Sequence, residues 1–434
     1  MPMLEKLGRR LLPLFQPTRS EDRRTIKELA AALAAQRVQA DRHRDDLKEV
    51  RRDVLQVQAQ VKEVRTEVAS GLGRQRDALE TAAHHVEVVN RDNLRRLQTT
   101  VSRNTGFVKG VLRQSRHITA HAVAQQRTLE RLGRIAASGR PVLVGPWTGE
   151  VGFELLYWIP FVRWFVEEYS VDPARLVVSS RGGPVSWYAG LSSRYVDVFD
   201  VVEPSVLAAA VGTRKQRHVG TVDCQVIDRM AADSGRPVSV LHPSYLYALS
   251  AAYLDGFAGV RSLSEVLKPA RVEAPPRRLV PGLPDEYVAA KFYFSASFPD
   301  TPANRAFVDA TLEKVSSRWP VVVLQTGVAV DEHQTYASGR CIDLSSLGAS
   351  MTPATNLEIQ TAVVAHARAF IGTYGGFAYL APLCGVPATV FHSEDEFYEH
   401  HRQLADVTFS RLHLPPLTVL PTRATELIGN PAGR

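Results

Sequence analysis

Two glycine-rich segments contain the residues best suited to chemistry on a phosphate-bearing ligand. One of them, residues 370–391, reads FIGTYGGFAYLAPLCGVPATVF, an apolar run followed by a glycine pair and a short helical pattern. Glycine lets the backbone approach a ligand closely, and the free N–H groups at a helix N-terminus favour phosphate. We therefore expect phosphate contacts from Thr373, Tyr374, Gly375, Gly376 and Phe377.

The other segment, residues 145–163 (GPWTGEVGFELLYWIPFVR), also leads from an apolar run into a helical pattern. Its only acids are Glu150 and Glu154. A carboxylate in such a loop can accept the proton of an attacking hydroxyl, so both residues are candidate catalytic bases. An acid in the first turn also suits the helix dipole, so a capping role for Glu150 stays open.

Further polar residues follow predicted strands, where ligand contacts gather in parallel sheets. In the C-terminal part we expect donor contacts from Lys291, Ser295, Gln325, Thr326, Gly327 and Glu394. In the part before it, Arg181 and His242 are candidates for contacts with an acceptor. A structural or solvated role is the alternative for each of these residues.

Several other chemistries lack their motifs. The chain contains no DxD pair for a metal-bound diphosphate, no GxxxxGK[ST] loop and no GxSxG elbow. Three scattered cysteines do not form a zinc pattern or a disulfide framework, and they indicate a reducing compartment. We expect no metal ion, no cofactor and a cytoplasmic location.

Around these segments the chain alternates short apolar runs with helical patterns, which predicts an α/β fold with parallel sheets. A proline-rich break at 269–284 separates two sets of strands, expected at 141–145, 176–180 and 196–202, and at 287–294, 321–325, 341–344, 370–373 and 388–391. We predict two Rossmann-like domains, 139–283 and 284–425, with the ligand in the cleft between them.

Residues 370–391 resemble the donor-binding half of GT-B glycosyltransferases, above all the heptosyltransferase-like and fucosyltransferase-like branches. This resemblance rests on the order of the elements: a strand, a glycine-rich turn, a helix with an internal proline, then GVP and a second strand. It implies that Thr373–Phe377 hold the diphosphate of a nucleotide-sugar, which is a substrate and not a cofactor. The first loop resembles that of fucosyltransferase-like proteins but has acids where they carry asparagine, which leaves the base open.

The N-terminal third has a different composition. Residues 1–138 contain 27 of the 52 basic residues and 16 of the 45 acidic ones, which gives this part a net charge of +11. The rest of the chain has a net charge of −4. Residues 20–138 are predicted to form a coiled coil, because apolar residues recur at spacings of three and four at Leu47, Val50, Val54, Val57, Val61, Val64 and Val68. We expect this seam to join copies into a homo-oligomer; an antiparallel hairpin turning near Gly71 or Gly106 is the alternative.

Residues 1–19 form a basic, leucine-rich segment that can lie on an anionic membrane surface. We expect peripheral contact with the inner face of the plasma membrane through Met3–Phe15, and no nucleic-acid partner. A solvated basic helix surface is the alternative interpretation of the charge.

These patterns together predict a metal-independent glycosyltransferase that moves a sugar from a nucleotide-sugar to a cell-surface glycan or lipid-linked acceptor. Two alternatives remain open. One is an enzyme like the polysaccharide pyruvyl transferases, which would use phosphoenolpyruvate. The other is a catalytically inactive coiled-coil scaffold whose α/β part only binds a nucleotide.

Overall fold

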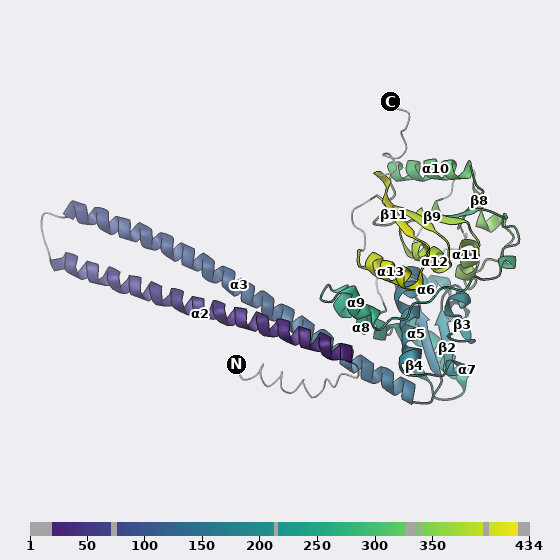
Figure 1. Cartoon of the computed structure of the whole chain (residues 1–434), viewed down its shortest axis with the longest axis horizontal. Coiled ribbons are helices and arrows are strands. Elements are labelled where there is room, and N and C mark those ends of the chain that lie inside the picture. The colour runs from purple at the N-terminus through teal and green to yellow at the C-terminus, as the bar shows by residue number, and fades with distance from the viewer. Residues whose placement is uncertain are drawn as a thin grey trace, which may run out of the picture. The chain divides into compact units, whose positions relative to one another are not determined.

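The computed structural model of the chain describes residues 20–70, 76–211, 216–325, 335–336, 341–393 and 399–423. The chain forms two compact units, Met1–Ala120 and His121–Arg434 (Figure 1). Helix α3 (Arg76–Ala137) runs through the boundary between them, and its last turns belong to the second unit. Within the described residues, no helix is both long and apolar enough to cross a membrane.

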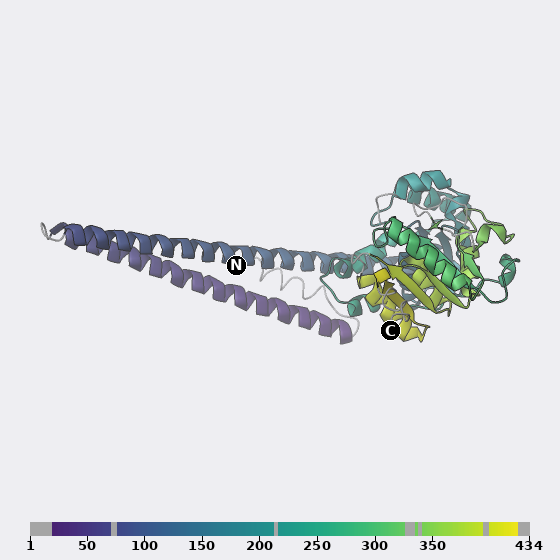
Figure 2. The ribbon, with the colours of Figure 1, turned by 90° about the horizontal axis from the view of Figure 1, so that it is seen from above.

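The first unit is a helical hairpin of α2 (Ser20–Ser70) and α3. Figures 1 and 2 show the two helices side by side, and the rings of His43 and Phe107 meet with centroids 5.4 Å apart. The helices therefore run antiparallel. Helix α2 is described as far as Ser70 and α3 from Arg76, and α3 continues through Gly106. The structure thus has the antiparallel hairpin that the sequence analysis gave as the alternative to a seam between copies.

The predicted seam packs in part against the same chain. Val54, Val57 and Val61 of α2 line one groove together with Leu94 and Leu97 of α3. The packing leaves much apolar surface in contact with water, since Val57 is 38% exposed and Leu94 is 46% exposed. The hairpin thus buries its apolar stripe only partly.

The second unit contains two mainly parallel sheets, so the predicted α/β fold with two parallel sheets is confirmed. The first sheet has the order β3-β2-β1-β4, with every pairing parallel. Its strands are β1 (Val142–Trp147), β2 (Leu176–Ser180), β3 (Tyr195–Asp197) and β4 (Ser239–Leu241). Its main helices are α5 (Ile159–Glu168), α6 (Pro204–Val211), α7 (Thr221–Ser234), α8 (Pro243–Leu254) and α9 (Val260–Ser264).

Two local features of this sheet differ from the sequence-based prediction. The strand expected over 196–202 ends at Asp197, because the Asp197 carboxylate accepts the Phe199 N–H and caps a short 3-10 helix, η4 (Val198–Asp200). The helix after β1 begins as α4 (Val151–Phe153) and passes through a π-helical turn, η1 (Glu154–Trp158), before α5. Such turns are often found at functional sites.

The second sheet has the order β11-β10-β9-β5-β6-β8, and β7 pairs antiparallel with β5. Its strands are β5 (Val288–Tyr293), β6 (Val321–Val323), β7 (Thr335–Tyr336), β8 (Ile342–Asp343), β9 (Ala369–Thr373), β10 (Ala388–His392) and β11 (Leu417–Pro421). Its helices are α10 (Pro302–Ser316), α11 (Asn356–Ala365), α12 (Gly376–Leu383) and α13 (Glu399–Leu412). The sequence patterns did not predict β11.

One hydrophobic core joins the two sheets. Val144 and Leu156 of the first half belong to the same buried cluster as Phe370 and Leu380 of the second, and Leu132 of α3 is fully buried in it. Helix α11 also packs on the segment after β2, where the Gly182 carbonyl accepts the Leu357 N–H at 2.7 Å. The proline-rich segment at 269–284 therefore connects two halves that share a hydrophobic core.

Candidate active site

The loop after β1 leads directly into the α4–η1–α5 helix. Gly145 has a φ of +113°, and a side chain there would collide with the Ser179 carbonyl, so only glycine suits this bend. Glu150 is exposed and holds the N-cap position, but its side chain makes no capping hydrogen bond. The capping alternative is thus not realised, and the carboxylate faces solvent as a base must.

Glu154, the second candidate base, lies in the protein interior with 0% of its surface exposed. It accepts hydrogen bonds from the Ser180 and Tyr188 hydroxyls. Burial raises its pKa to about 7, although those two hydrogen bonds and the charge of Arg181 act in the opposite direction. An acceptor hydroxyl in solvent has no access to this group, whereas Glu150 is exposed.

Arg181 follows β2 and is only 7% exposed. Its Nε and Nη2 donate to the Gly149 carbonyl at 3.1 and 3.0 Å. The guanidinium therefore holds the backbone of the first loop, and this contact replaces the acceptor contact that we expected of it.

Asp197, a residue that the sequence did not single out, lies in the same region. Its carboxylate accepts the Gly183 N–H at 2.6 Å and the Tyr195 hydroxyl at 2.9 Å. Burial raises its pKa to about 6 against these hydrogen bonds. Both charged groups act on Glu154, because the charge of Arg181 lowers its pKa and the charge of Asp197 raises it.

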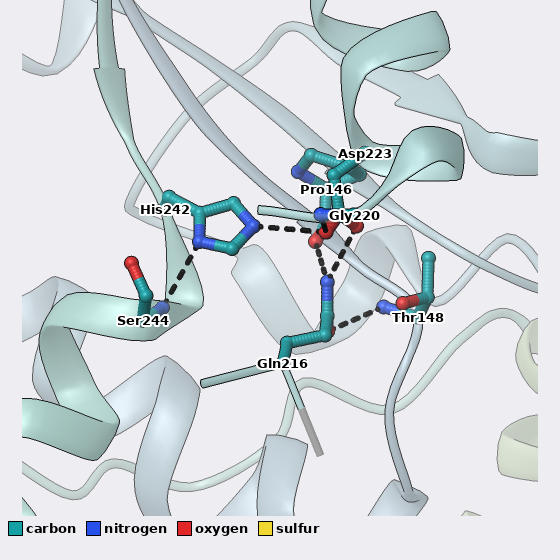
Figure 3. A network of polar contacts seen from close by, with 7 residues as sticks. All are labelled: Pro146, Thr148, Gln216, Gly220, Asp223, His242 and Ser244. Atoms are coloured by element: carbon teal, nitrogen blue, oxygen red, sulfur yellow. Dashed lines mark hydrogen bonds and ion pairs between the residues drawn. The ribbon is translucent and has the colours of Figure 1, made fainter. Parts of the chain in front are cut away.

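His242, the other expected acceptor contact, is 2% exposed. Its Nδ1 accepts the Ser244 N–H at 3.1 Å and caps α8, while its Nε2 lies 3.2 Å from the Asp223 carboxylate (Figure 3). An acceptor cannot reach this ring. The structure therefore assigns His242 to a buried polar network that also contains Gln216 and Asp223.

The glycine pair after β9 is closely packed. A Cβ on Gly376 would lie 2.7 Å from the Gly152 nitrogen, and one on Gly375 would overlap the Tyr293 hydroxyl. Thr373 forms two hydrogen bonds with the Tyr293 backbone, which fixes the start of the turn. The glycines thus allow the predicted phosphate-binding turn and the predicted catalytic loop to touch, and the N-termini of α4 and α12 meet at this contact.

Lys291, near the end of β5, is half-buried beside the first turn of α12. Its Nζ donates to Gln360 Oε1 at 2.6 Å and lies 4.0 Å from the centre of the Phe377 ring. Gln360 in turn donates to the Asn356 side chain. The ammonium group is therefore held next to the α12 N-terminus, where it adds positive charge.

The other expected donor contacts are less defined. Ser295 pairs with Phe298 through the backbone and shares a hydrogen bond with Ser297, so it forms a turn after β5. Gln325 follows β6, and its buried Oε1 has no partner among the described residues. Thr326, Gly327 and Glu394 lie outside the described residues. A search of the described residues finds no group of three His, Cys, Asp or Glu side chains that could hold a metal ion.

Several residues of this region carry no clear sequence signal. Gln216 lies outside any helix or strand, and Asn356 and Gln360 appear in the sequence as ordinary helix residues. Only Asp223 has a recognisable position, three residues after Gly220 in the first turn of α7. Their contacts join segments far apart in the chain, which local patterns do not encode.

Comparison with known proteins finds similarity at the level of structure. No protein-family model and no curated protein matches the chain. Similar solved structures include the iron-containing dodecameric glycosyltransferase TibC from enterotoxigenic E. coli H10407, with 17% identity, a TM-score of 0.31, and 60% of this chain and 61% of that chain covered. This chain therefore spans less than two thirds of the length of TibC.

Two further similar structures are a glycosyl transferase family 9 protein and a heptosyltransferase. The Veillonella parvula family 9 protein has 13% identity and a TM-score of 0.35, with 67% of this chain and 88% of that chain covered. E. coli ADP-heptose LPS heptosyltransferase II has 12% identity and a TM-score of 0.33, with 65% and 89% covered.

Proposed function

We propose that the α/β unit is a glycosyltransferase that uses a nucleotide-sugar donor. One observation carries this proposal: Gly152 and Gly376 meet, so that two helix N-termini converge at the carboxyl ends of strands from both sheets. Lys291 lies beside the second of these helices. A diphosphate is the ligand whose charge this arrangement suits, because helix N-termini and cations both favour anions.

In the proposed reaction Glu150 accepts the proton of an acceptor hydroxyl. The hydroxyl oxygen attacks the anomeric carbon of the donor as the bond from that carbon to the diphosphate breaks. The nucleoside diphosphate leaves with the bonding electron pair, and the α12 N-terminus and Lys291 stabilise its charge. We propose that the reaction needs no metal ion or cofactor and that the acceptor is a glycan or a lipid-linked sugar.

A thermal-shift panel tests donor binding. The panel contains nucleotide-sugars with different bases, free nucleoside diphosphates and phosphoenolpyruvate. A ligand at about 100 times its Kd stabilises the folded state by about 2.7 kcal/mol, which raises Tm measurably. Stabilisation by one nucleotide class, weakened in Lys291→Ala and not in the exposed-lysine control Lys314→Ala, supports the proposal.

The same panel separates the alternatives. A shift with phosphoenolpyruvate alone would favour a pyruvyl transferase. No shift with any ligand would contradict donor binding and leave the scaffold interpretation. Turnover is then followed as release of nucleoside diphosphate from the donor that gives the largest shift.

We also propose that the hairpin joins two copies of the chain. The groove lined by Val54, Val57, Val61, Leu94 and Leu97 continues the helix–helix interface within the chain, and Leu55 and Val64 nearby are 59% and 54% exposed. A second hairpin would cover these residues and form a four-helix bundle, the usual way to bury such stripes. The segment Met3–Phe15 lies outside the described residues; we keep its membrane contact as a proposal that depends on the oligomer.

Sedimentation of the full chain tests this assembly. Val57→Asp should give a monomer, because a charge in the groove would be buried in the bundle. Val219→Asp, at a 52% exposed position of the α/β unit, is the control and should leave the mass unchanged. A wild-type protein that sediments as a monomer would contradict the assembly, and anionic-vesicle pelleting of both variants then tests membrane contact separately.

A further inference from the structure

The backbone of the loop after β1 is held by side chains from two directions. On one side Arg181 donates twice to the Gly149 carbonyl. On the other side the Gln216 amide accepts the Thr148 N–H at 2.9 Å and donates to the Pro146 carbonyl at 2.8 Å. These contacts satisfy three backbone groups at the end of β1 and just after it, beyond the register shift that interrupts the β1–β2 pairing between Val144 and Trp147.

Gln216 is itself fixed by a buried acid and a histidine. Its Nε2 donates to Asp223 Oδ1 at 2.9 Å, and Asp223 Oδ2 accepts the Gly220 N–H at 2.7 Å. The same Oδ2 of Asp223 lies 3.2 Å from His242 Nε2, as Figure 3 shows. Because His242 Nδ1 accepts the Ser244 N–H, Nε2 is the ring nitrogen that faces Asp223.

This network determines the orientation of the Gln216 amide. Its nitrogen faces two acceptors and its oxygen faces a donor, so only one of the two amide orientations satisfies all three contacts. Gln216, Asp223 and His242 are 6%, 4% and 2% exposed, which leaves little water to replace a lost partner. An unpaired group in this region would therefore cost more than one at the surface.

We propose that Gln216, oriented by Asp223 and His242, is a positioning residue that sets the loop conformation from which Glu150 acts. This inference rests on the proposed glycosyl transfer, because Glu150 is the base of that reaction. Gln216 itself does not touch the reacting atoms. Thr148 is 4% exposed whereas Glu150, two residues later, is exposed, so the network holds the buried part of the loop and leaves its acid in solvent.

The test uses the full chain with Gln216→Met, which keeps the side-chain length and removes all three hydrogen bonds. Gln225→Met is the matched control, an exposed glutamine on α7. Hydrogen–deuterium exchange of a peptide that covers residues 146–150 is measured without substrate. The Thr148 amide should exchange faster in Gln216→Met and at the wild-type rate in Gln225→Met, and equal rates in the two variants would overturn the inference.

Steady-state kinetics give the second readout. Gln216→Met should lower kcat by about 10- to 100-fold and leave the donor KM within about twofold, since small displacements of a catalytic group have effects of this size. In a Glu150→Gln background the same change should have almost no further effect on kcat. An unchanged kcat in Gln216→Met, or a full additional loss in the double variant, would contradict positioning through Glu150.

A second variant controls for a folding defect in Gln216→Met. His242→Asn keeps an acceptor for the Ser244 N–H, because asparagine is a good N-cap residue, and removes only the contact with Asp223. It should raise the exchange of residues 146–150 less than Gln216→Met does, and no rise at all would count against the role of His242. If no donor is turned over by the wild type, the proposed function fails while the exchange data still decide whether Gln216 holds the loop.

Discussion

The loop after β1 and the turn after β9 meet at one contact but are stabilised in different ways. The loop depends on buried side chains, since Gln216 and Arg181 reach in from distant segments to hold its backbone. The turn instead depends on glycine having no side chain, since Gly375 leaves room for Tyr293 and Gly376 leaves room for Gly152. Polar side chains can place a reacting group, whereas glycines bring backbone N–H groups close to a ligand. The first segment is therefore suited to catalysis and the second to binding.

Glu150→Gln gives the sharpest test of this division. The change keeps the size of the side chain and removes its basicity, so turnover should fall by roughly 10²–10⁴-fold while donor affinity stays near that of the wild type. Initial rates and donor titrations are measured in parallel, with Glu203→Gln at an exposed position as the control. A large loss of donor affinity would instead place the donor at the first loop.

Gly376→Val should affect the turn after β9, the second of the two segments compared. Its Cβ would lie 2.7 Å from the Gly152 nitrogen, a backbone atom that cannot rotate away. Overpacking of this kind lowers the free energy of unfolding by about 1–3 kcal/mol, and we expect donor-induced thermal stabilisation to disappear. Gly106→Val, where a Cβ meets nothing within 4 Å, is the control in urea unfolding. Wild-type donor binding in Gly376→Val would show that the contact does not shape the binding site.

The raised pKa of Glu154, which lies in the helix after the first loop, predicts that the stability of the folded protein depends on pH. Its pKa is raised to about 7, so the folded protein binds a proton that the unfolded chain releases near 4.5. The resulting stabilisation is complete below about pH 4.5 and is lost as the pH rises through about 7.

Urea unfolding at pH 5 and pH 8 measures this effect. Glu154→Gln keeps an oxygen for Ser180 and Tyr188 and cannot ionise, so the stability difference between the two pH values should shrink relative to wild type. Part of the difference should remain, because the pKa of Asp197 is raised for the same reason. An unchanged difference in the variant would mean that Glu154 ionises normally in the folded protein.

Gly375→Ala should have the smallest effect. The backbone at Gly375 has a φ of 171°, which any residue adopts, and the new Cβ would overlap the hydroxyl of Tyr293 and lie 2.9 Å from its ring carbon Cζ, so that this one side chain must shift. We expect a loss of about 1 kcal/mol in the free energy of unfolding. Tyr293→Phe in the same chain should recover part of that loss, and a double variant as unstable as the sum of the two single ones would contradict the steric account.

The sequence predicted the parts of this molecule that depend on local pattern. The apolar runs at β1, β2, β9 and β10, the proline within α12 and the helix stop at Gly385 all appear in the structure as expected. The antiparallel return near Gly71 was one of two open alternatives, because glycine at both Gly71 and Gly106 weakens a helix similarly in the sequence. Tertiary packing decided between them.

The candidate site was less predictable because its contacts are long-range. Arg181 and His242 were singled out for their places after strands, but their partners Gly149 and Asp223 turn them toward the interior. Burial of Glu154 also followed from packing against β2, which no spacing of acids reveals. The strand β11 was missed because it lies between prolines, which usually argue against a strand.

The segment between the two sheets has a consequence for dividing the protein. Lys268 N–H donates to the Pro160 carbonyl, Val272 N–H donates to the Leu383 carbonyl, and His366 Nε2 lies 2.8 Å from the Pro275 carbonyl. These contacts hold the connecting segment in place along its length, and the sheets on either side of it share a large buried apolar cluster. Two gene fragments divided near Pro281 should each be insoluble when expressed alone, and should assemble into a native-like complex when produced in the same cell.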